Sequence, residues 1–280
     1  MNIRITSDST CDLTAQQLAA HNIATCPLVV NKGGEAFRDG VDIHPDDIYA
    51  HVAAGGELCS TTAGSVGEYQ ELFEKYAKDF DAVVHISLGS GFSSSYQNAC
   101  LAASEFDNVV AIDSCNLSTG QGLVVLKACE LANSISSMEE MKRILDEFTP
   151  KVEASFLLDQ LGYMVKGGRC STVAALGANL LNLKPCIEVK GGKMSVVKKY
   201  RGVYAKSLAS YVKDRLANRD DLDRKTLFVT NTPVSDDCMQ AVKDSVEAYA
   251  DFEEIFWTKA GCTISCHCGP GTLGVLFVRK

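Results

Sequence analysis

Short runs of apolar, β-branched residues alternate with longer segments of helical periodicity along the first half of the chain. Between residues 66 and 80, for example, Tyr69, Leu72, Phe73 and Tyr76 fall on one face of a helix. Such alternation is typical of a parallel sheet built from βαβ units. The pattern predicts strands over 3–6, 25–30, 82–87 and 109–113, and helices over 14–21, 66–80, 96–103, 120–135 and 137–149.

The pattern changes after Pro150, which ends the last of these helices. Two alternating runs, 185–190 and 193–199, flank Gly191-Gly192, as in a β-hairpin with a glycine turn. The remaining runs predict strands over 155–158, 226–230, 254–258 and 274–279, and helices over 172–182, 203–218 and 235–249. We therefore expect two α/β domains, over residues 1–150 and 151–280.

Four loops rich in serine and threonine adjoin the predicted strands and helices, over residues 5–10, 59–65, 87–97 and 112–120. Ser, Thr and Asp often occur in such loops simply as helix N-caps. These loops, however, hold more hydroxyls than one cap for each helix requires. Open α/β sheets bind ligands at the carboxyl ends of their strands, so we expect the four loops to share one binding rim.

The loop over 87–97, with the sequence SLGSGFSSSYQ, is the most informative of the four. Serine hydroxyls and the free backbone N–H groups of a helix N-terminus suit an anionic or carbonyl group. The loop contains no Lys or Arg, which weakens an interpretation as a phosphate site. Arg169 and Arg201, each beside a glycine, are candidates for an inter-domain or ligand-binding role.

Composition narrows the class of protein. Of the 280 residues 46% are hydrophobic and 22% charged, which is typical of a globular protein. The net charge of -8 argues against a surface for nucleic acid or anionic membrane, because both favour a basic face. The first residues, MNIRITSD, do not resemble a signal peptide, and no apolar run reaches spanning length. We expect a soluble, cytoplasmic protein without stable membrane insertion.

The twelve cysteines have irregular spacing, unlike a disulfide framework, and we interpret them as reduced and mostly buried. The densest set of metal-ligand side chains is Cys262, Cys266, His267 and Cys268. It has neither Cys-x-x-Cys spacing nor a second paired cluster, so we expect no metal.

Serine chemistry is the alternative that the residues leave open. The segment Gly91-Phe-Ser-Ser-Ser95 superficially resembles a nucleophile elbow, yet it lacks the second glycine, and no His and Asp follow in the expected order. His267, in a glycine-rich loop, is the candidate base. The chain has neither a P-loop lysine nor a dinucleotide fingerprint, and we expect no cofactor.

Several short motifs together identify a resemblance. They are Ser7-Asp-Ser-x-x-Asp-Leu13, Thr61-Thr-Ala-Gly-Ser-Val-Gly-Glu-Tyr69, Gly91-Phe-Ser-Ser-Ser-Tyr-Gln97, Asp113-Ser-x-x-x-Ser-x-Gly-Gln-Gly122, Lys166-Gly-Gly-Arg169, Lys184-Pro185, Arg201-Gly202 and His267-x-Gly-Pro-Gly271. In this order they resemble the motifs of the DegV family, and the match covers essentially the whole chain. The resemblance implies an N-terminal parallel-sheet α/β domain, a smaller C-terminal α/β domain with a mixed sheet, and a ligand tunnel between them.

The resemblance also implies a function. Members of the DegV family are bacterial fatty-acid-binding proteins that hold one acyl chain in a buried tunnel. In bacteria with a fatty acid kinase they present the acid to the kinase subunit, which makes the acyl phosphate. We therefore expect a lipid carrier rather than an enzyme, a monomer that docks transiently on a kinase. A serine-dependent hydrolase or other small-molecule enzyme using the same rim is the alternative.

Site residues follow from the resemblance by position. It implies that Thr61 and Ser93 bind the carboxylate, with Thr62 as an alternative donor, and that His267 and Arg201 lie near the head group. Arg169 is expected to support the domain interface, and Ser94 adds bulk where the family usually has glycine. The expected tail-lining residues are Phe92, Phe156, Leu161, Leu176, Leu180 and Ile264.

Overall fold

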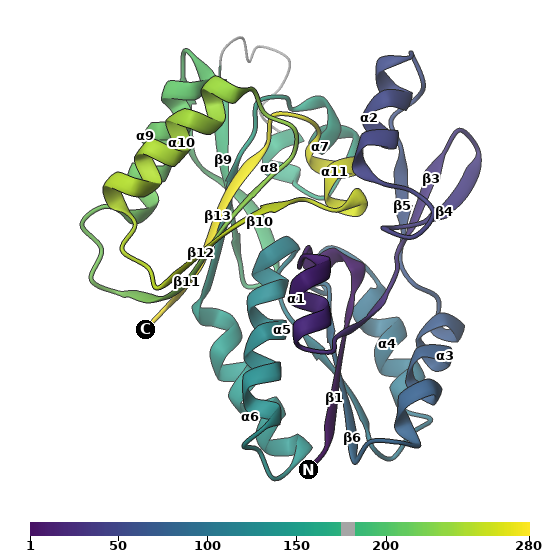
Figure 1. Cartoon of the computed structure of the whole chain (residues 1–280). Helices are drawn as coiled ribbons and strands as arrows, with labels where there is room; N and C mark the ends of the chain where they lie inside the picture. The colour runs from purple at the N-terminus through teal and green to yellow at the C-terminus, as the bar shows by residue number, and fades with distance from the viewer. Residues whose placement is uncertain (175–182) are drawn as a thin grey trace.

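Four parallel strands form the first sheet, in the order β2-β1-β6-β7 (Figure 1). The computed structural model describes residues 1–174 and 183–280. The strands are β1 (Ile3–Asp8), β2 (Ala24–Cys26), β6 (Ala82–Ser87) and β7 (Val109–Asp113). The predicted parallel sheet of the N-terminal part is therefore confirmed.

Helices cover both faces of this sheet (Figure 1). α3 (Val66–Ala77) and α4 (Ser95–Ala103) pack on one face, against Val83 and Ala111. α5 (Ser118–Ala132) and α6 (Met138–Phe148) lie on the other, where Val84 and Ile112 join a different cluster. Successive residues of a strand point to opposite faces, which explains why β6 is buried along its whole length. The short helix α1 is Ala15–Ala20.

The second sheet is mixed and has six strands, in the order β10-β9-β8-β13-β11-β12. They are β8 (Val152–Leu157), β9 (Leu183–Lys190), β10 (Lys193–Arg201), β11 (Leu222–Asn231), β12 (Glu254–Lys259) and β13 (Leu273–Arg279). Only β11 and β12 pair in parallel. α9 (Tyr204–Leu216) and α10 (Asp236–Tyr249) cover one face. Two α/β domains are thus confirmed, while their boundary at Pro150 stays a prediction.

Helix α5 lies between the two sheets and contacts both (Figure 1). On one side it packs against β1 and β6, and on the other against β8, β11 and β13. Its residues from Ser118 to Val125 are all buried, whichever way they point. One apolar cluster therefore runs through both halves of the molecule, from Ile5 and Val84 to Phe156 and Leu276.

A third sheet, antiparallel and three-stranded, lies beside the first in the order β4-β3-β5. Its strands are β3 (Val29–Lys32), β4 (Glu35–Arg38) and β5 (Ser60–Thr62), and α2 (Pro45–Ala53) follows β4. The prediction of one strand over 25–30 was wrong, because this segment is divided between β2 and β3. Pro27 separates them: it has no N–H to donate, and the next amide, of Leu28, bonds to the Ser9 hydroxyl at 3.1 Å.

The described residues of the C-terminal half also form the short helices α7 (Gly162–Gly167), α8 (Ser171–Ala174) and α11 (Cys262–Cys268). Of the helix predicted over 172–182, residues 175–182 lie outside the described residues. The sequence predicts a glycine-rich loop around His267, but that residue stands in the last turn of α11. α11 packs on β3, β5 and α2, so this C-terminal helix rests on the N-terminal half.

A fully buried polar cluster holds β1, β6 and α3 together around Asp8. One carboxylate oxygen accepts from the Tyr69 hydroxyl at 2.6 Å and lies 3.3 Å from His85 Nε2. The other accepts from the Ser87 hydroxyl at 2.9 Å and the Leu88 amide at 2.7 Å. Burial opposes a charge here, but the hydrogen bonds of His85, Tyr69 and Leu88 hold the pKa of Asp8 below its ordinary value. The cluster fixes the point at which the serine-rich loop leaves β6.

Replacing Asp8 by alanine should therefore destabilise the fold strongly. Asp8→Ala leaves buried donors from three elements without an acceptor, and we expect the free energy of unfolding to fall by about 3 kcal/mol or more. Urea titration followed by circular dichroism measures the change. Asp79→Ala, at an exposed position, is the control and should stay within about 0.5 kcal/mol of the unmodified protein. A similar small effect for both variants would contradict this role of Asp8.

Candidate functional site

A narrow cavity of about 60 Å³ lies where β5, the serine-rich loop, α7, β10 and α11 meet. Polar side chains gather at it: Thr61, Ser93, Thr263, Arg169 and His267. The rest of its wall is apolar and sulfur-containing, formed by Leu28, Ala63, Leu88, Phe92, Leu117, Met164, Met194, Ile264 and Cys268. Four of the residues predicted from the sequence to bind or support a head group therefore share one space.

Thr61 and His267 are in direct contact across the cavity, with Thr61 Oγ1 2.8 Å from His267 Nε2. β5 pairs with β3 and turns alternate side chains to opposite faces. Thr61 consequently faces α11, whereas the exposed Thr62 accepts a hydrogen bond from Asn31 at 3.0 Å. The structure brings Thr61, and not its neighbour Thr62, to the cavity.

The imidazole of His267 is uncharged at neutral pH. Burial, and then the positive charge of Arg169, lower its pKa to about 4. Its other ring nitrogen, Nδ1, is buried without a hydrogen-bond partner among the described residues. Gly167 makes room for the ring, because a Cβ at this position would lie 2.4 Å from Nδ1.

The serine-rich loop contributes Ser93, whose hydroxyl lies 2.9 Å from that of Ser95. Ser94 is exposed and precedes α4 without a side-chain capping bond. Gly91 packs against the turn of the β9–β10 hairpin, where a Cβ would lie 1.9 Å from the carbonyl oxygen of Gly192. The hairpin thus lies directly on the loop that carries Ser93.

Arg169 is the basic side chain at this cavity among the residues that the structure describes. It follows α7, is exposed, and donates to the Gly167 carbonyl at 2.6 Å. Arg201, in contrast, is exposed at the end of β10 and does not line the cavity. The sequence assigned Arg201 to the head group and Arg169 to the interface; in the structure the guanidinium at the cavity is that of Arg169.

A second cavity of about 30 Å³ adjoins the first and shares Leu117, Ile264 and Cys268 with it. It extends toward β8, β11 and β13, past Phe156 and Leu276. The hydroxyls that line this second cavity are hydrogen-bonded to other parts of the protein: those of Ser118, Ser155, Thr230, Thr232 and Thr272. The two adjoining spaces therefore form a mainly apolar path from Thr61 and Ser93 into the shared core.

Three predicted tail residues, Phe92, Phe156 and Ile264, line these spaces. Leu161 packs at the edge of the core without lining either. Leu176 and Leu180 lie outside the described residues. Met164 and Met194 also line the first cavity but were not predicted to do so. Their place in its wall depends on how α7 and β10 pack, which the sequence pattern does not show.

The four hydroxyl-rich loops do not contribute equally to the site. Those over 59–65 and 87–97 provide Thr61 and Ser93 to the first cavity, and that over 112–120 provides Leu117 to both. The loop over 5–10 lines neither space, and its Asp8 belongs to the buried cluster described above. The expected rim is therefore built mainly by two loops, together with α7 and α11 of the other half.

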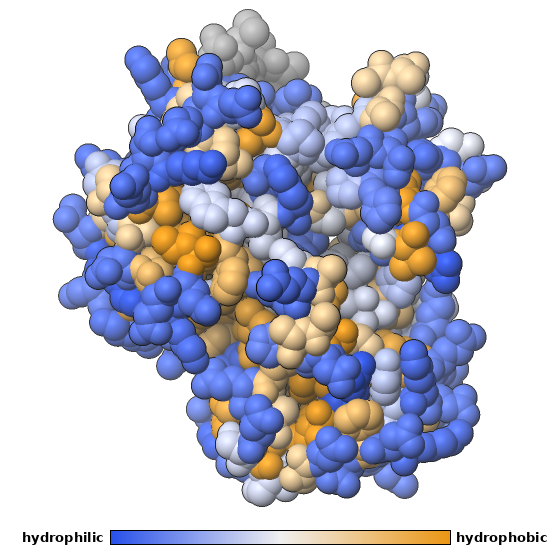
Figure 2. Space-filling model, in the orientation of Figure 1, coloured by the Kyte–Doolittle hydropathy of each residue, from blue (hydrophilic) through white to orange (hydrophobic). Residues whose placement is uncertain are grey.

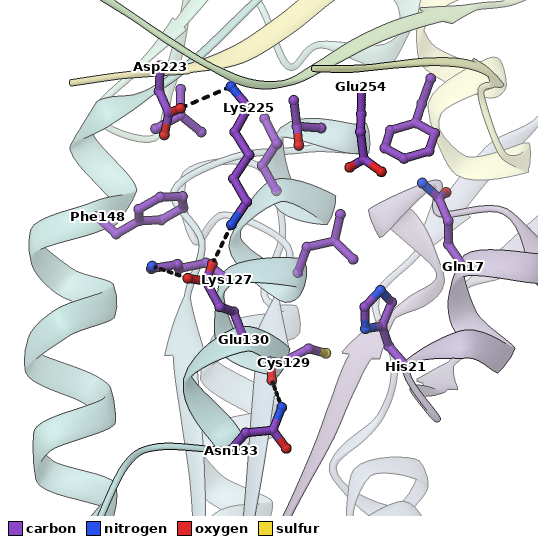
Figure 3. Close-up of a pocket in the computed structure, with 15 residues that line it drawn as sticks. Gln17, His21, Lys127, Cys129, Glu130, Asn133, Phe148, Asp223, Lys225 and Glu254 are labelled. Atoms are coloured by element: carbon purple, nitrogen blue, oxygen red, sulfur yellow. Dashed lines mark hydrogen bonds and ion pairs between the residues drawn. The ribbon is translucent and has the colours of Figure 1, made fainter. Parts of the chain in front are cut away.

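A larger groove, of about 600 Å³, lies on another side of α5, between α1, α6 and the strands β11 and β12 (Figure 3). Its charged side chains largely satisfy one another: Lys127 and Lys225 both pair with Glu130, at 3.3 and 3.4 Å. The space-filling view shows hydrophobic and hydrophilic residues interspersed over the region where the two halves of the molecule meet (Figure 2). None of the residues predicted to bind a ligand lines this groove.

Over 1–174 and 183–280, no helix is both long enough and apolar enough to cross a membrane. In the same residues, no group of three or more His, Cys, Asp and Glu side chains is arranged to hold a metal ion.

Comparison with known proteins gives one consistent match. A family model described as the uncharacterised DegV family matches residues 2–280. A DegV domain-containing protein of Clostridium acetobutylicum is 32% identical over 283 residues, which cover 99% of each chain.

Two solved structures agree with this match. A DegV family protein from Thermus thermophilus, described as binding fatty acid, has a TM-score of 0.92 and 27% identity, with 100% of both chains covered. A stearic acid-binding protein from Eubacterium ventriosum has a TM-score of 0.82 and 26% identity, covering 99% of this chain and 98% of its own.

The lowered pKa of His267 predicts a loss of stability in acid. Between about pH 6.5 and pH 4 the unfolded chain binds a proton that the folded imidazole does not, so the free energy of unfolding falls as the pH decreases through this window. His267→Gln should remove roughly 2 kcal/mol of the loss between about pH 7 and pH 4.5, measured by urea titration. Identical profiles for the unmodified protein and His267→Gln would contradict the assignment.

Proposed function

The chain belongs to the DegV family, and from this premise we propose that it binds one long-chain fatty acid. The carboxylate lies among Thr61, Ser93 and Arg169, and the acyl chain runs inward past Phe92 and Ile264. The observation that supports this most directly is the gathering of hydroxyl and guanidinium groups at one end of an apolar path. Such a gradient of polarity fits an amphiphile with a single polar end.

The acyl chain supplies most of the affinity in this proposal. Burying about fifteen methylenes at roughly 0.8 kcal/mol each gives a gross gain of about 12 kcal/mol, from which the cost of ordering the ligand is subtracted. The two hydroxyls at the head group add a smaller amount, on the order of 1 to 3 kcal/mol each. Their main role is to fix the orientation of the ligand, with its carboxylate beside Thr61 and Ser93.

The path must widen to hold such a chain. The two cavities, of about 60 and 30 Å³, are smaller than the roughly 300 to 1,000 Å³ of common small-molecule sites. Met164 of α7 and Met194 of β10 both line the first cavity, and their unbranched side chains can change rotamer without displacing the backbone. We propose that these methionines move aside when the ligand enters.

The charge of the head group is balanced by Arg169 and not by His267. An imidazole with a pKa of about 4 is neutral at physiological pH and acts through one hydrogen bond to Thr61. Arg169 brings a permanent positive charge to the same cavity. Carboxylates near a cation keep their charge, so we propose that the ligand binds as the carboxylate ion.

We further propose that the protein presents the bound acid to a fatty acid kinase as a monomer that docks transiently. The family resemblance suggests this role, and the exposure of Arg169 supports it, because the head group then lies near the surface. The serine hydrolase alternative has no comparable support. The Ser93 hydroxyl is bonded to Ser95, and no imidazole among the described residues is bonded to it.

Mass spectrometry of the purified protein tests the central proposal. Native spectra should show the mass of one fatty acid per chain, and organic extraction should release it. Reproducible absence of lipid, even after incubation with palmitate or oleate, would overturn the proposal. Esterase activity lost in Ser93→Ala would instead support the hydrolase.

The head-group assignment predicts a contrast between neighbouring residues. Thr61→Ala combined with Ser93→Ala should weaken fatty acid binding by about 10- to 100-fold, because two donors to the carboxylate are lost while the apolar path stays. Titration with a fluorescent fatty acid measures the change, and circular dichroism checks the fold.

The matched control is Thr62→Ala combined with Ser94→Ala, which removes the same groups from exposed positions next to the site. It should bind as the unmodified protein does. Equal loss in both double variants would indicate a general effect of the substitutions, and no loss in either would place the head group elsewhere.

A further inference from the structure

Two carboxylates from the N-terminal half hold the first turn of α11, which belongs to the C-terminal half. Asp39 accepts hydrogen bonds from the amides of Cys262 and Thr263, both at 3.0 Å, and from the Thr263 hydroxyl at 2.6 Å. Asp12 accepts from the Gly261 amide at 2.9 Å. Backbone donors that open the helix are thus satisfied from outside the segment that forms it.

Both carboxylates are buried, with 4% and 7% of Asp39 and Asp12 exposed. Neither forms an ion pair with the described residues, so hydrogen bonds, and for Asp12 also a bound proton, offset the cost of burial. Ser9 donates a further bond to Asp39 at 3.2 Å, and the Ser118 hydroxyl lies 2.5 Å from Asp12. Each of the two side chains is therefore also held by one hydroxyl of the N-terminal half.

Helix α11 depends on these contacts because its own sequence favours helix weakly. Its seven residues, CTISCHC, are mainly cysteine, β-branched and serine, and isolated helices of this length are unstable in water. Thr263 and His267 are four residues apart and lie on the same face of the helix. Asp39 holds that face at one end, and His267 meets Thr61 at the other.

We propose that Asp39, assisted by Asp12, is a positioning residue for His267. The carboxylates set the location of α11, and α11 presents the imidazole to Thr61. The effect on ligand affinity rests on the proposed fatty acid function, whereas the effect on the imidazole does not. The same contacts join the two halves of the molecule next to the cavity, so the head-group site keeps its form only while this junction is closed.

Substitution by asparagine should disturb Asp39 more than Asp12. Four donors face Asp39, and an asparagine there would turn an N–H group toward at least one of them. For Asp12, burial raises the pKa to about 8, and the nearby carboxylate of Asp39 adds to the increase. The other groups facing it are the Ser118 hydroxyl, the Gly261 amide and the thiols of Cys11 and Cys268. Asp12 carries a proton at neutral pH, so asparagine resembles its native form.

The experiment compares Asp39→Asn, Asp12→Asn and Asp42→Asn. Asp42 is exposed in the same loop and pairs with Arg38, so its substitution removes a charge without touching α11. Two measurements are made on each: the NMR titration of the His267 ring, assigned with His267→Gln, and fatty acid affinity. Asp39→Asn should move the ring resonance, raise its titration midpoint from about 4 toward its ordinary value, and weaken binding by about 10-fold or more. Asp12→Asn and Asp42→Asn should change both by less than about 3-fold or a few tenths of a pH unit.

Gly261→Ala is the second variant, which keeps the proposal testable if Asp39→Asn does not fold. A Cβ at this position would lie 2.7 Å from Asp12 Oδ1, so the first turn of α11 and the Asp12 side chain must move apart while both acids remain. It should shift the His267 resonance as well. A folded Asp39→Asn or Gly261→Ala with an unchanged His267 titration overturns the proposal. If the unmodified protein binds no fatty acid but the variants still alter the His267 titration, the positioning role is sustained and only the proposed function is overturned.

Discussion

Helix α5 constrains the whole molecule because it is buried against two sheets at once. A helix enclosed in this way cannot move with one sheet without losing its contacts to the other. Its first turns carry the polar links to both sides. Gln121 bonds to Ser7 at 3.0 Å and to Thr10 at 2.8 Å, while Thr119 lies 2.6 Å from Thr230 of β11. Leu117, the residue just before α5, lines both cavities. The packing of α5 between the two sheets therefore also determines the geometry of the site.

The polar end of the cavity is formed by separate parts of the chain, and no single part supplies all of its polar side chains. Thr61 comes from the three-stranded sheet, Ser93 from the loop after β6, Arg169 from the turn after α7, and His267 from α11. Hydroxyls and a neutral imidazole form directional hydrogen bonds without a large desolvation cost on burial, since none of these groups is charged. Among the residues that the structure describes, the cation at this cavity is Arg169, which is exposed and largely keeps its hydration. This division lets the interior stay apolar.

The pattern of hydrophobic residues along the chain predicts the helices and strands that form through local periodicity. The pattern predicts β1, β6 and β7 of the parallel sheet, the hairpin at Gly191-Gly192 and the helices α3 and α5, whereas the strand predicted over 25–30 is divided between β2 and β3. α11 was not predicted, because its stability comes from carboxylates more than 200 residues away. The choice between Thr61 and Thr62 also needs the register of β5 with β3, which no single segment contains. Arg169 and Arg201 both stand beside glycine, and only tertiary structure separates them.

Strand β13 lies in the middle of the mixed sheet, between β8 and β11, although it is the last strand in sequence. During synthesis β8 and β11 therefore have no partner for these edges until Leu273–Arg279 has left the ribosome. Unpaired edges of this kind are sites of intermolecular strand pairing. Its pairing with β8 also closes a loop of more than 100 residues, a slow type of step in folding. Until β13 is inserted, the nascent chain is consequently exposed to aggregation at these edges of β8 and β11, and a chaperone would protect it during that interval.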